Sequence, residues 1–146
     1  MQYRHRQFGR PAVVSGIAMT AILTVLFFYA GRGRPLLMAI FAAALALEIV
    51  VHYLLSSLTV EVSADELSWH FGPCFWRRRV ARSAIARVVG VRLPWWYGLG
   101  MKATRRGWVY LVEPGEGIEV ALANGEAVRI GTDDAEGLLA ALTKAP

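Results

Sequence analysis

The chain has a single cysteine, Cys74, and only three histidines among its 146 residues. One cysteine excludes an internal disulfide, so cysteine usage leaves the redox compartment undetermined. A zinc site needs several clustered His and Cys ligands, and the pair His70 and Cys74, four residues apart, has no second cluster to accompany it. We therefore expect neither a metal site nor a cofactor.

Sequence signatures of catalysis are also missing. Gly98-Leu99-Gly100 lacks the remaining glycine spacing of a phosphate-binding loop. Ser56 and Ser57 are not part of a Gly-x-Ser-x-Gly nucleophile turn. These absences predict a protein that is not an enzyme, and no small-molecule substrate can be identified.

Acidic residues are absent from residues 1–34, which contain five arginines, whereas residues 59–146 hold eleven basic and ten acidic groups. The net charge of +5 and the pI near 9.9 therefore come from arginines beside the apolar segments described next. Juxtamembrane arginines attract anionic lipid headgroups. This distribution argues against nucleic-acid binding and favours a membrane partner.

What the sequence does have is two long apolar segments, residues 11–30 and 35–55, separated by Gly31-Arg32-Gly33-Arg34. Twenty helical residues rise about 30 Å, the thickness of a bilayer core. Two such segments predict a transmembrane hairpin that follows a basic N-terminal tail, residues 1–10. A cleaved signal peptide is the less favoured alternative, because the first apolar run is longer than usual and ends in bulky residues.

The arginine distribution also predicts orientation. Three arginines precede the first helix and two lie between the helices, which by the positive-inside rule favours a cytoplasmic N-terminus. Two spans then return the chain to the same side. We therefore expect a multi-pass protein of the inner (cell) membrane whose C-terminal domain is cytoplasmic.

The two apolar segments carry small residues at helical spacing, which lets helices approach closely. The first has a stripe of Ala12, Gly16, Thr20 and Thr24, and the second has a cluster of Ala39, Ala42, Ala43 and Ala46. These two faces are expected to pack together. Glu48 and His52, on the same face as Leu37, Phe41 and Ala44, are then expected to point away from the first helix.

An ionisable pair within a membrane is usually paired or functional. Three interpretations of Glu48 and His52 stay open. The pair is neutralised locally with no further role, it contacts another subunit or protein, or it moves protons, although the segment offers no second acid or base for a relay.

From Leu58 onward the pattern alternates with period two, which is typical of strands. Strands are predicted at residues 58–62, 66–71, 76–80, 88–93, 101–104, 108–112, 118–121 and 126–130. A final helix is predicted from Asp133 with Glu136 as a capping box and from the apolar face of Leu138, Leu139 and Leu142. This pattern describes a small all-β barrel or sandwich, residues 56–146, capped by a C-terminal helix and expected to fold alone.

Several short motifs in this region occur together in a familiar order. They are Leu67-Ser68-Trp69-His70-Phe71-Gly72, Ile85-Ala86-Arg87-Val88, Trp96-Tyr97-Gly98-Leu99-Gly100, Gly107-Trp108-Val109-Tyr110, Ala121-Leu122-Ala123-Asn124-Gly125 and Arg129-Ile130-Gly131-Thr132-Asp133-Asp134. In this order they resemble the bacterial pleckstrin-homology-like (PH-like) domains of small membrane proteins, over about residues 56–143. The resemblance implies a scaffold role without catalytic residues.

Domains of this fold often bind phosphoinositides through basic residues, so the resemblance makes Arg77, Arg78, Arg79 and Arg82 candidates for lipid contact. Arginine forks suit phosphate oxygens, although a solvated strand face is the favoured alternative. Trp95, Trp96 and Tyr97 form a second candidate, a loop that either lies in the headgroup layer or on a partner, or folds back over the domain.

These observations together favour a membrane-anchored, non-catalytic interaction or scaffold module that binds a protein partner or lipid headgroups. The alternative is a small subunit of a membrane complex, or a homo-oligomer, in which the Glu48 and His52 face of the hairpin is the binding element. An enzyme of unrecognised type ranks third.

Overall fold

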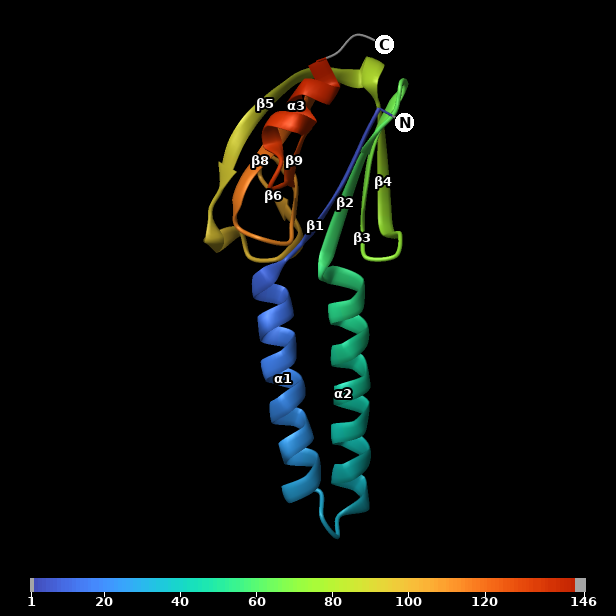
Figure 1. Cartoon of the computed structure of the whole chain (residues 1–146), viewed down its shortest axis with the longest axis vertical. Helices are drawn as coiled ribbons and strands as arrows, with labels where there is room; N and C mark the ends of the chain where they lie inside the picture. Colours follow the sequence, from blue (N-terminus) through green and yellow to red (C-terminus); the bar gives the residue numbers. More distant parts are fainter. Residues whose placement is uncertain (1, 144–146) are drawn as a thin grey trace.

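The computed structural model describes residues 2–143. Two antiparallel helices, α1 (Arg10–Tyr29) and α2 (Pro35–Leu55), extend from one end of a two-sheet domain (Figure 1). The most apolar 18-residue stretch of each helix has a mean hydropathy of 2.1. Of this stretch, 11% is buried in α1 and none is buried in α2. They are therefore long and apolar enough to span a membrane, and they are not core helices of the domain.

The first sheet, sheet A, contains β1 (Tyr3–Phe8), β2 (Ser57–Val62), β3 (Glu66–Phe71) and β4 (Phe75–Ala81). The strands pair antiparallel in the order β1-β2-β3-β4. The helical hairpin is thus inserted between two neighbouring strands of one sheet. Phe8 lies opposite Ser57, at the point where the chain leaves and re-enters the sheet.

Strand β1 corrects the prediction of an N-terminal tail at residues 1–10. Tyr3, His5 and Gln7 face the domain and alternate with the exposed Arg4 and Arg6, which is the period-two pattern of a strand. The arginine content of this segment had suggested only a membrane anchor. The partner strand begins almost fifty residues later, so no local turn signal marks the pairing. The domain is therefore assembled from both sides of the hairpin.

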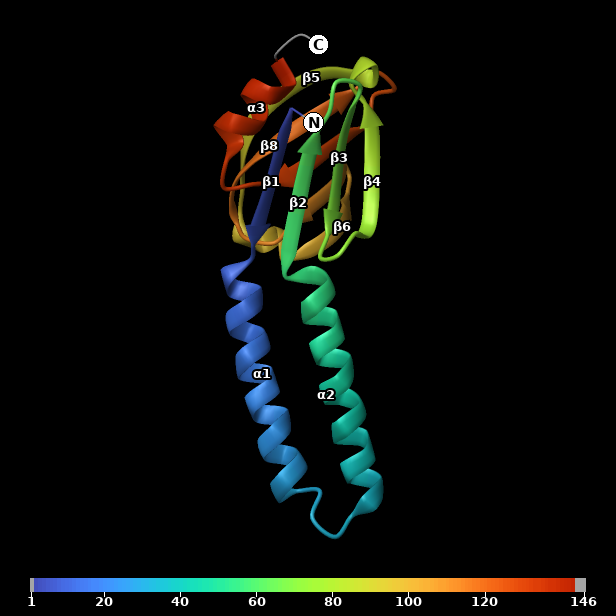
Figure 2. The ribbon, with the colours of Figure 1, turned by 45° about the vertical axis from the view of Figure 1, so that its right-hand side comes forward.

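The second sheet, sheet B, contains β5 (Ile85–Leu93), β6 (Gly100–Thr104), β7 (Gly107–Leu111), β8 (Gly115–Leu122) and β9 (Ala127–Gly131). Their order is β5-β8-β9-β7-β6, with β7 and β9 parallel and the other pairs antiparallel. Two 3-10 turns, η1 (Arg82–Ala84) and η2 (Trp95–Tyr97), flank β5. Helix α3 (Ala135–Thr143) packs beside β5 and β8 (Figure 2).

The domain is a sandwich, one of the two alternatives expected from the sequence, and not a closed barrel. The strands form two separately paired sheets. All eight strands predicted after residue 56 are present, with ends shifted by a few residues. The β strands and the C-terminal helix are thus confirmed, and β1 is the strand that the sequence pattern missed.

The core lies between the two sheets. Trp69 of β3 meets Tyr110 of β7 edge-on, with ring centroids 5.3 Å apart. Of the three leucines expected to bury the last helix, Leu138 is fully buried and is joined by Ala135 and Ala141, whereas Leu139 and Leu142 are partly buried. The other buried core residues include Leu58, Val60, Val62, Leu67, Phe71, Ile118, Val120 and Ile130.

The cap of α3 is Asp134 and not Asp133, which corrects the predicted capping box. Oδ1 of Asp134 accepts the backbone N–H of Gly137 at 3.0 Å, and its Oδ2 accepts the hydroxyl of Tyr3 at 2.9 Å. Asp133 pairs instead with His5. The two aspartates therefore hold β1 against the start of α3, a long-range contact that a local capping pattern cannot reveal.

Replacing Tyr3 with phenylalanine should lower the free energy of unfolding by about 1 kcal/mol at neutral pH, because a hydrogen bond to a carboxylate is lost. Burial, and then the hydrogen bond to Asp134, raise the pKa of Tyr3 above its ordinary value. The folded state thus favours the neutral phenol, so this stabilisation is present below about pH 10 and is lost as the pH rises further.

Equilibrium unfolding of both proteins in mild detergent, at neutral and at strongly alkaline pH, measures the effect. The difference between wild type and Tyr3→Phe should shrink at alkaline pH. A difference that stays constant or grows with pH would contradict this role of the Tyr3 hydroxyl.

Candidate functional site

A polar cluster lies between the two long helices. Thr20 Oγ1 of α1 donates to Glu48 Oε2 of α2 at 2.8 Å, and His52 Nδ1 lies 2.9 Å from Glu48 Oε1. The Glu48 side chain is only 10% exposed. Thr20 of the facing helix therefore binds Oε2, whereas Oε1 contacts the ring of His52, whose Nδ1 hydrogen-bonds the backbone carbonyl oxygen of Glu48 at 3.1 Å.

The expectation that Glu48 and His52 point away from α1 is wrong. On α2, the residues of their face are half-buried against α1, whereas the alanines expected to form the seam are exposed. The half-buried residues are Leu37, Phe41, Ala44, Glu48 and His52, and the exposed ones are Ala39, Ala42, Ala43 and Ala46. Side-chain size alone suggested the wrong face, because in an apolar setting a carboxyl group needs a hydrogen-bonding partner.

On α1, the small-residue stripe does face α2. A Cβ atom built on Gly16 would lie 2.5 Å from Cδ2 of His52, so the imidazole ring occupies the space that a side chain would need. Beside this contact an open groove of about 520 Å³ is bordered by Ile17, Thr20, Ile49 and Tyr53, among others. The two helices contain no other carboxylate or histidine, and the contacts of this cluster run between the facing sides of α1 and α2.

A cross-linking experiment tests this face. With Cys74 replaced by serine, cysteines at Thr24 and Ala44 should be joined within one chain by an oxidant or a short thiol reagent, because both positions are half-buried in the seam. Cysteines at Thr24 and Ala43 are the matched control and should join poorly. Trypsin cleavage after Arg32, followed by non-reducing electrophoresis, detects the cross-link as fragments that stay together.

The opposite outcome is informative. Efficient joining of Thr24 to Ala43, with little joining to Ala44, would mean that the alanine face does contact α1.

The arginines predicted as a lipid contact, Arg77, Arg78, Arg79 and Arg82, do not all lie on one surface. Arg77 donates to Glu61 at 2.8 Å, and Arg4 lies 3.3 Å from the other oxygen of Glu61. Arg79 lies opposite Ser68, whereas Arg78 lies opposite the buried Trp69 and so belongs to the other face of the strand. Arg77 and Arg79 thus share the outer face of sheet A with the arginines of β1.

Arg82 is separated from this group. Its guanidinium donates to the carbonyl oxygen of Leu142 at 3.0 Å, to Gln2 at 3.0 Å and to the carbonyl oxygen of Ser63 at 3.3 Å. It joins η1 to the ends of α3 and β1, at the end of the domain remote from the helices (Figure 1). Its role in the fold is structural, and this position does not favour lipid contact.

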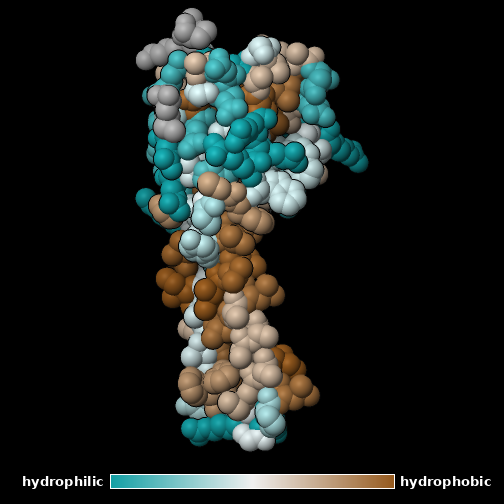
Figure 3. Space-filling model, turned by 90° about the vertical axis from the view of Figure 1, so that its right-hand side faces the viewer, coloured by the Kyte–Doolittle hydropathy of each residue, from teal (hydrophilic) through white to brown (hydrophobic). Residues whose placement is uncertain are grey.

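The outer face of sheet A forms a basic surface, which we define by Arg4, Arg6, Arg77 and Arg79. Between these arginines the two central strands carry small or polar residues that are almost fully buried, namely Ser57, Thr59, Ser68 and His70. Arg6 donates to the hydroxyl of Ser57 at 3.1 Å. Seen from this side, the domain is mostly hydrophilic above strongly apolar helices (Figure 3).

The three aromatic residues of η2 differ in their environment. Tyr97 folds back over sheet B, where its hydroxyl lies 3.1 Å from Nη1 of Arg129 and its ring packs in a small cluster with Leu93 and Leu111. Trp95 and Trp96 remain exposed. Folding back over the domain, one of the two alternatives from the sequence, describes Tyr97, whereas contact of Trp95 and Trp96 with headgroups or a partner stays a prediction.

Two further exposed aromatic residues were missed by the sequence analysis. Phe75 and Trp76 follow the turn between β3 and β4, and the amide of Gly72 in that turn donates to the carbonyl oxygen of Ser57, beside the end of α2. The sequence signal was Phe75-Trp76, one residue after the Gly72-Pro73 break. Only the three-dimensional structure places it at the helix-side end of the domain.

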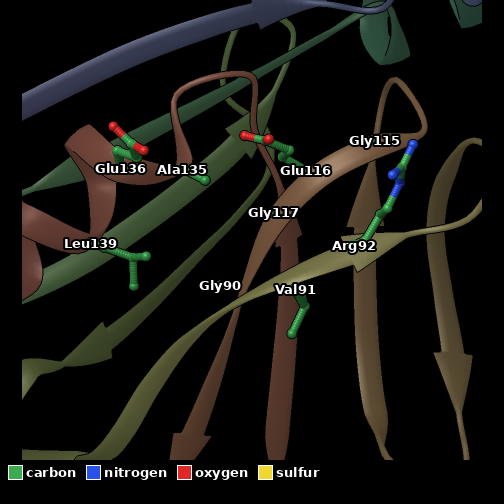
Figure 4. A pocket seen from close by; sticks show the side chains of 9 residues that line it. All are labelled: Gly90, Val91, Arg92, Gly115, Glu116, Gly117, Ala135, Glu136 and Leu139. Atoms are coloured by element: carbon green, nitrogen blue, oxygen red, sulfur yellow. The ribbon is translucent and has the colours of Figure 1, made fainter.

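A shallow depression of about 470 Å³ lies between sheet B and α3 (Figure 4). Gly90 of β5 faces Leu139 of α3 across it, since a Cβ atom built on Gly90 would lie 3.5 Å from Cδ1 of Leu139. The charged residues at its border are Arg92, Glu116 and Glu136, with no histidine, cysteine or serine among the lining residues. The lining thus offers carboxylate and guanidinium groups but no hydroxyl, thiol or imidazole.

Within residues 2–143, no group of three or more His, Cys, Asp or Glu side chains lies close enough together to hold a metal ion. Comparison of the chain with protein-family models, with curated proteins and with solved structures found no match. The resemblance to PH-like domains therefore stays a prediction drawn from the sequence motifs.

Proposed function

We propose that this protein is a membrane-anchored, non-catalytic interaction module. In this proposal α1 and α2 span the inner membrane, and the sandwich, a PH-like domain, lies on the cytoplasmic surface. It binds a protein partner or lipid headgroups there. The one observation that carries the proposal is the insertion of the apolar hairpin between two neighbouring strands of sheet A.

This insertion holds the domain in a fixed orientation to the helices. A single residue, Gly9, separates β1 from α1, and a single residue, Ser56, separates α2 from β2. The amide of Gly9 donates to the carbonyl oxygen of Ser56 at 2.8 Å, and Gly9 packs against the backbone of Val112 with no room for a side chain. A domain joined in this way presents one constant face to partners, unlike a domain on a flexible linker.

The surface of the helices supports membrane insertion. Large apolar side chains are exposed on the faces of both helices that do not contact the other helix, including Ile17, Leu36 and Leu47. Soluble proteins rarely expose apolar surface of this extent. Helices satisfy their own backbone hydrogen bonds and are therefore suited to the interior of a bilayer.

The basic surface of sheet A is the best candidate for partner binding. Four arginines share this face with two acids, Glu61 and Glu66, and their excess positive charge suits phosphate or carboxylate groups. The alternative, binding through the Glu48 and His52 face of the hairpin, lacks support because α1 occupies that face.

Recovery of partners under mild detergent tests the proposal. The double variant Arg77→Gln and Arg79→Gln should lose co-purifying acidic proteins or anionic lipids that wild type retains. Arg105→Gln and Arg106→Gln, two exposed arginines in the turn after β6, form the matched control and should retain them. Equal recovery from all three proteins would remove the basic surface from the proposal, and release of the chain by alkaline carbonate would refute anchoring.

A further inference from the structure

Five exposed aromatic residues lie at the helix-side end of the domain. They come from the end of β1, the turn after β3 and the turn η2, and we call them the helix-side aromatic residues: Phe8, Phe75, Trp76, Trp95 and Trp96. We infer that they are seated in the headgroup layer of the leaflet next to the domain. The inference rests on the proposed membrane anchoring and identifies lipid as the partner of this one surface.

Contacts with the helices fix the position of each segment. Phe8 lies one residue before the junction with α1. A Cβ atom on Gly72, in the turn before Phe75, would lie 2.6 Å from the carbonyl oxygen of Leu54 near the end of α2. Just after η2, Leu99 and Gly100 border a small cavity together with residues of both helices. All three segments therefore meet the bilayer boundary if the helices cross it.

The exposure of these rings is high. The exposed fractions are 56% for Phe8, 37% for Phe75, 46% for Trp76, 75% for Trp95 and 68% for Trp96. Single exposed aromatic residues need no explanation, but several at one end of a small domain mark an interaction surface. Tryptophan in particular is enriched where bilayer meets water, since its ring is apolar and its N–H can reach headgroups.

The backbone of the β3–β4 turn points to the same conclusion. Gly72 and Cys74 in the turn and Trp76 at the start of β4 adopt the left-handed conformation, with φ of 46°, 73° and 52°. Non-glycine residues adopt it at an energetic cost and keep it where the surroundings impose it. Here His70 Nδ1 accepts the amide of Cys74 at 3.2 Å, which holds the turn and its exposed rings in place.

Lipid suits this surface better than a soluble partner. The surface is continuous with the start of α1 and the end of α2, so a bilayer around the helices reaches it without further adjustment. Arg6, Arg10 and Lys102 lie near it, the guanidinium of Arg6 being 4.7 Å from the centre of the Phe8 ring, together with Glu113, whose carboxylate accepts the amide of Arg10 at 3.4 Å. The five rings themselves carry no charge, so zwitterionic glycerophospholipid is sufficient to seat them.

Fluorescence quenching in vesicles tests the inference. The experiment uses four variants of the full-length protein, each with two tryptophans. All four keep the buried Trp69, and each keeps one of Trp76, Trp95, Trp96 or Trp108, with the other tryptophans replaced by phenylalanine. Trp108 is the matched control, because it is 41% exposed but lies at the start of β7, at the opposite end from Val112, which packs on Gly9. A variant with Trp69 alone gives the background.

Phosphatidylcholine with bromine near the glycerol end of its acyl chains should quench Trp76, Trp95 and Trp96 severalfold more than Trp108. Emission from Trp108 should fall no further than the Trp69 background. Equal weak quenching of all four would overturn the inference, and it is also the result expected if a protein covers this surface. Alkaline carbonate extraction of the same vesicles separates the two proposals, since a retained but unquenched chain leaves the anchoring intact.

Discussion

Residues 57–146 on their own should fail to fold into a stable domain. Strand β1 covers one edge of β2, a strand whose Leu58 and Val60 are each only 1% exposed in the complete sheet. Without β1 the sheet loses a quarter of its strands, and the start of α3 loses its contacts with Tyr3 and His5. Small domains are stable by only about 5–15 kcal/mol, so the loss of a whole strand is expected to remove cooperative unfolding.

The matched polypeptide restores β1 without the helices. Residues 2–8 joined to residues 57–146 through Asn-Gly would place a two-residue turn between Phe8 and Ser57, which already lie opposite each other. This chain should be soluble, should show the circular dichroism of a β-rich protein and should unfold cooperatively. The shorter chain should show no cooperative transition.

Two results would contradict this account. Equal cooperative unfolding of both polypeptides would mean that β1 is dispensable, and the original expectation of a self-sufficient C-terminal domain would then hold. Failure of both would mean that the sandwich depends on the helices themselves.

The difference between β1 and the eight strands after the hairpin shows which parts of this fold a sequence can predict. Eight strands were predictable because each is a short segment bounded by turn residues, as with Asn124-Gly125 between β8 and β9, and because some, such as β2, also alternate in polarity. The strand β1 alternates equally well, but it is separated from β2 by the entire hairpin. Local patterns contain no information about a pairing over that distance.

The candidate sites were predictable in composition but not in arrangement. Glu48 and His52 were recognisable as the ionisable pair of the apolar segments, yet their direction depended on Thr20, a residue assigned only to a packing stripe. In the aromatic loop, the burial of Tyr97 depends on Arg129 from a strand thirty-two residues later. In both cases the deciding partner is distant in sequence, and residue size or periodicity could not supply it.

The close contact between Gly16 and the His52 ring leads to the second prediction with a large effect. Replacing Gly16 with leucine should separate the two helices. A Cβ atom at this position already lies within 3.0 Å of three atoms of the His52 ring, and leucine adds three more carbons beyond it. The imidazole must then rotate away, which breaks its 2.9 Å contact with Glu48 and leaves the carboxyl group with Thr20 alone. Overpacking of this kind typically costs about 1–3 kcal/mol.

Leucine favours bilayer insertion, so a defect cannot be attributed to poor insertion. The measurement is the cross-link between cysteines at positions 24 and 44, together with the thermal unfolding of the detergent-solubilised protein. Both should fall sharply for Gly16→Leu and only moderately for Gly16→Ala. Ala18→Leu, on the exposed side of α1 two residues away, is the control and should behave like wild type. Undiminished cross-linking in Gly16→Leu would show that the helices do not depend on the close approach of Gly16 to His52.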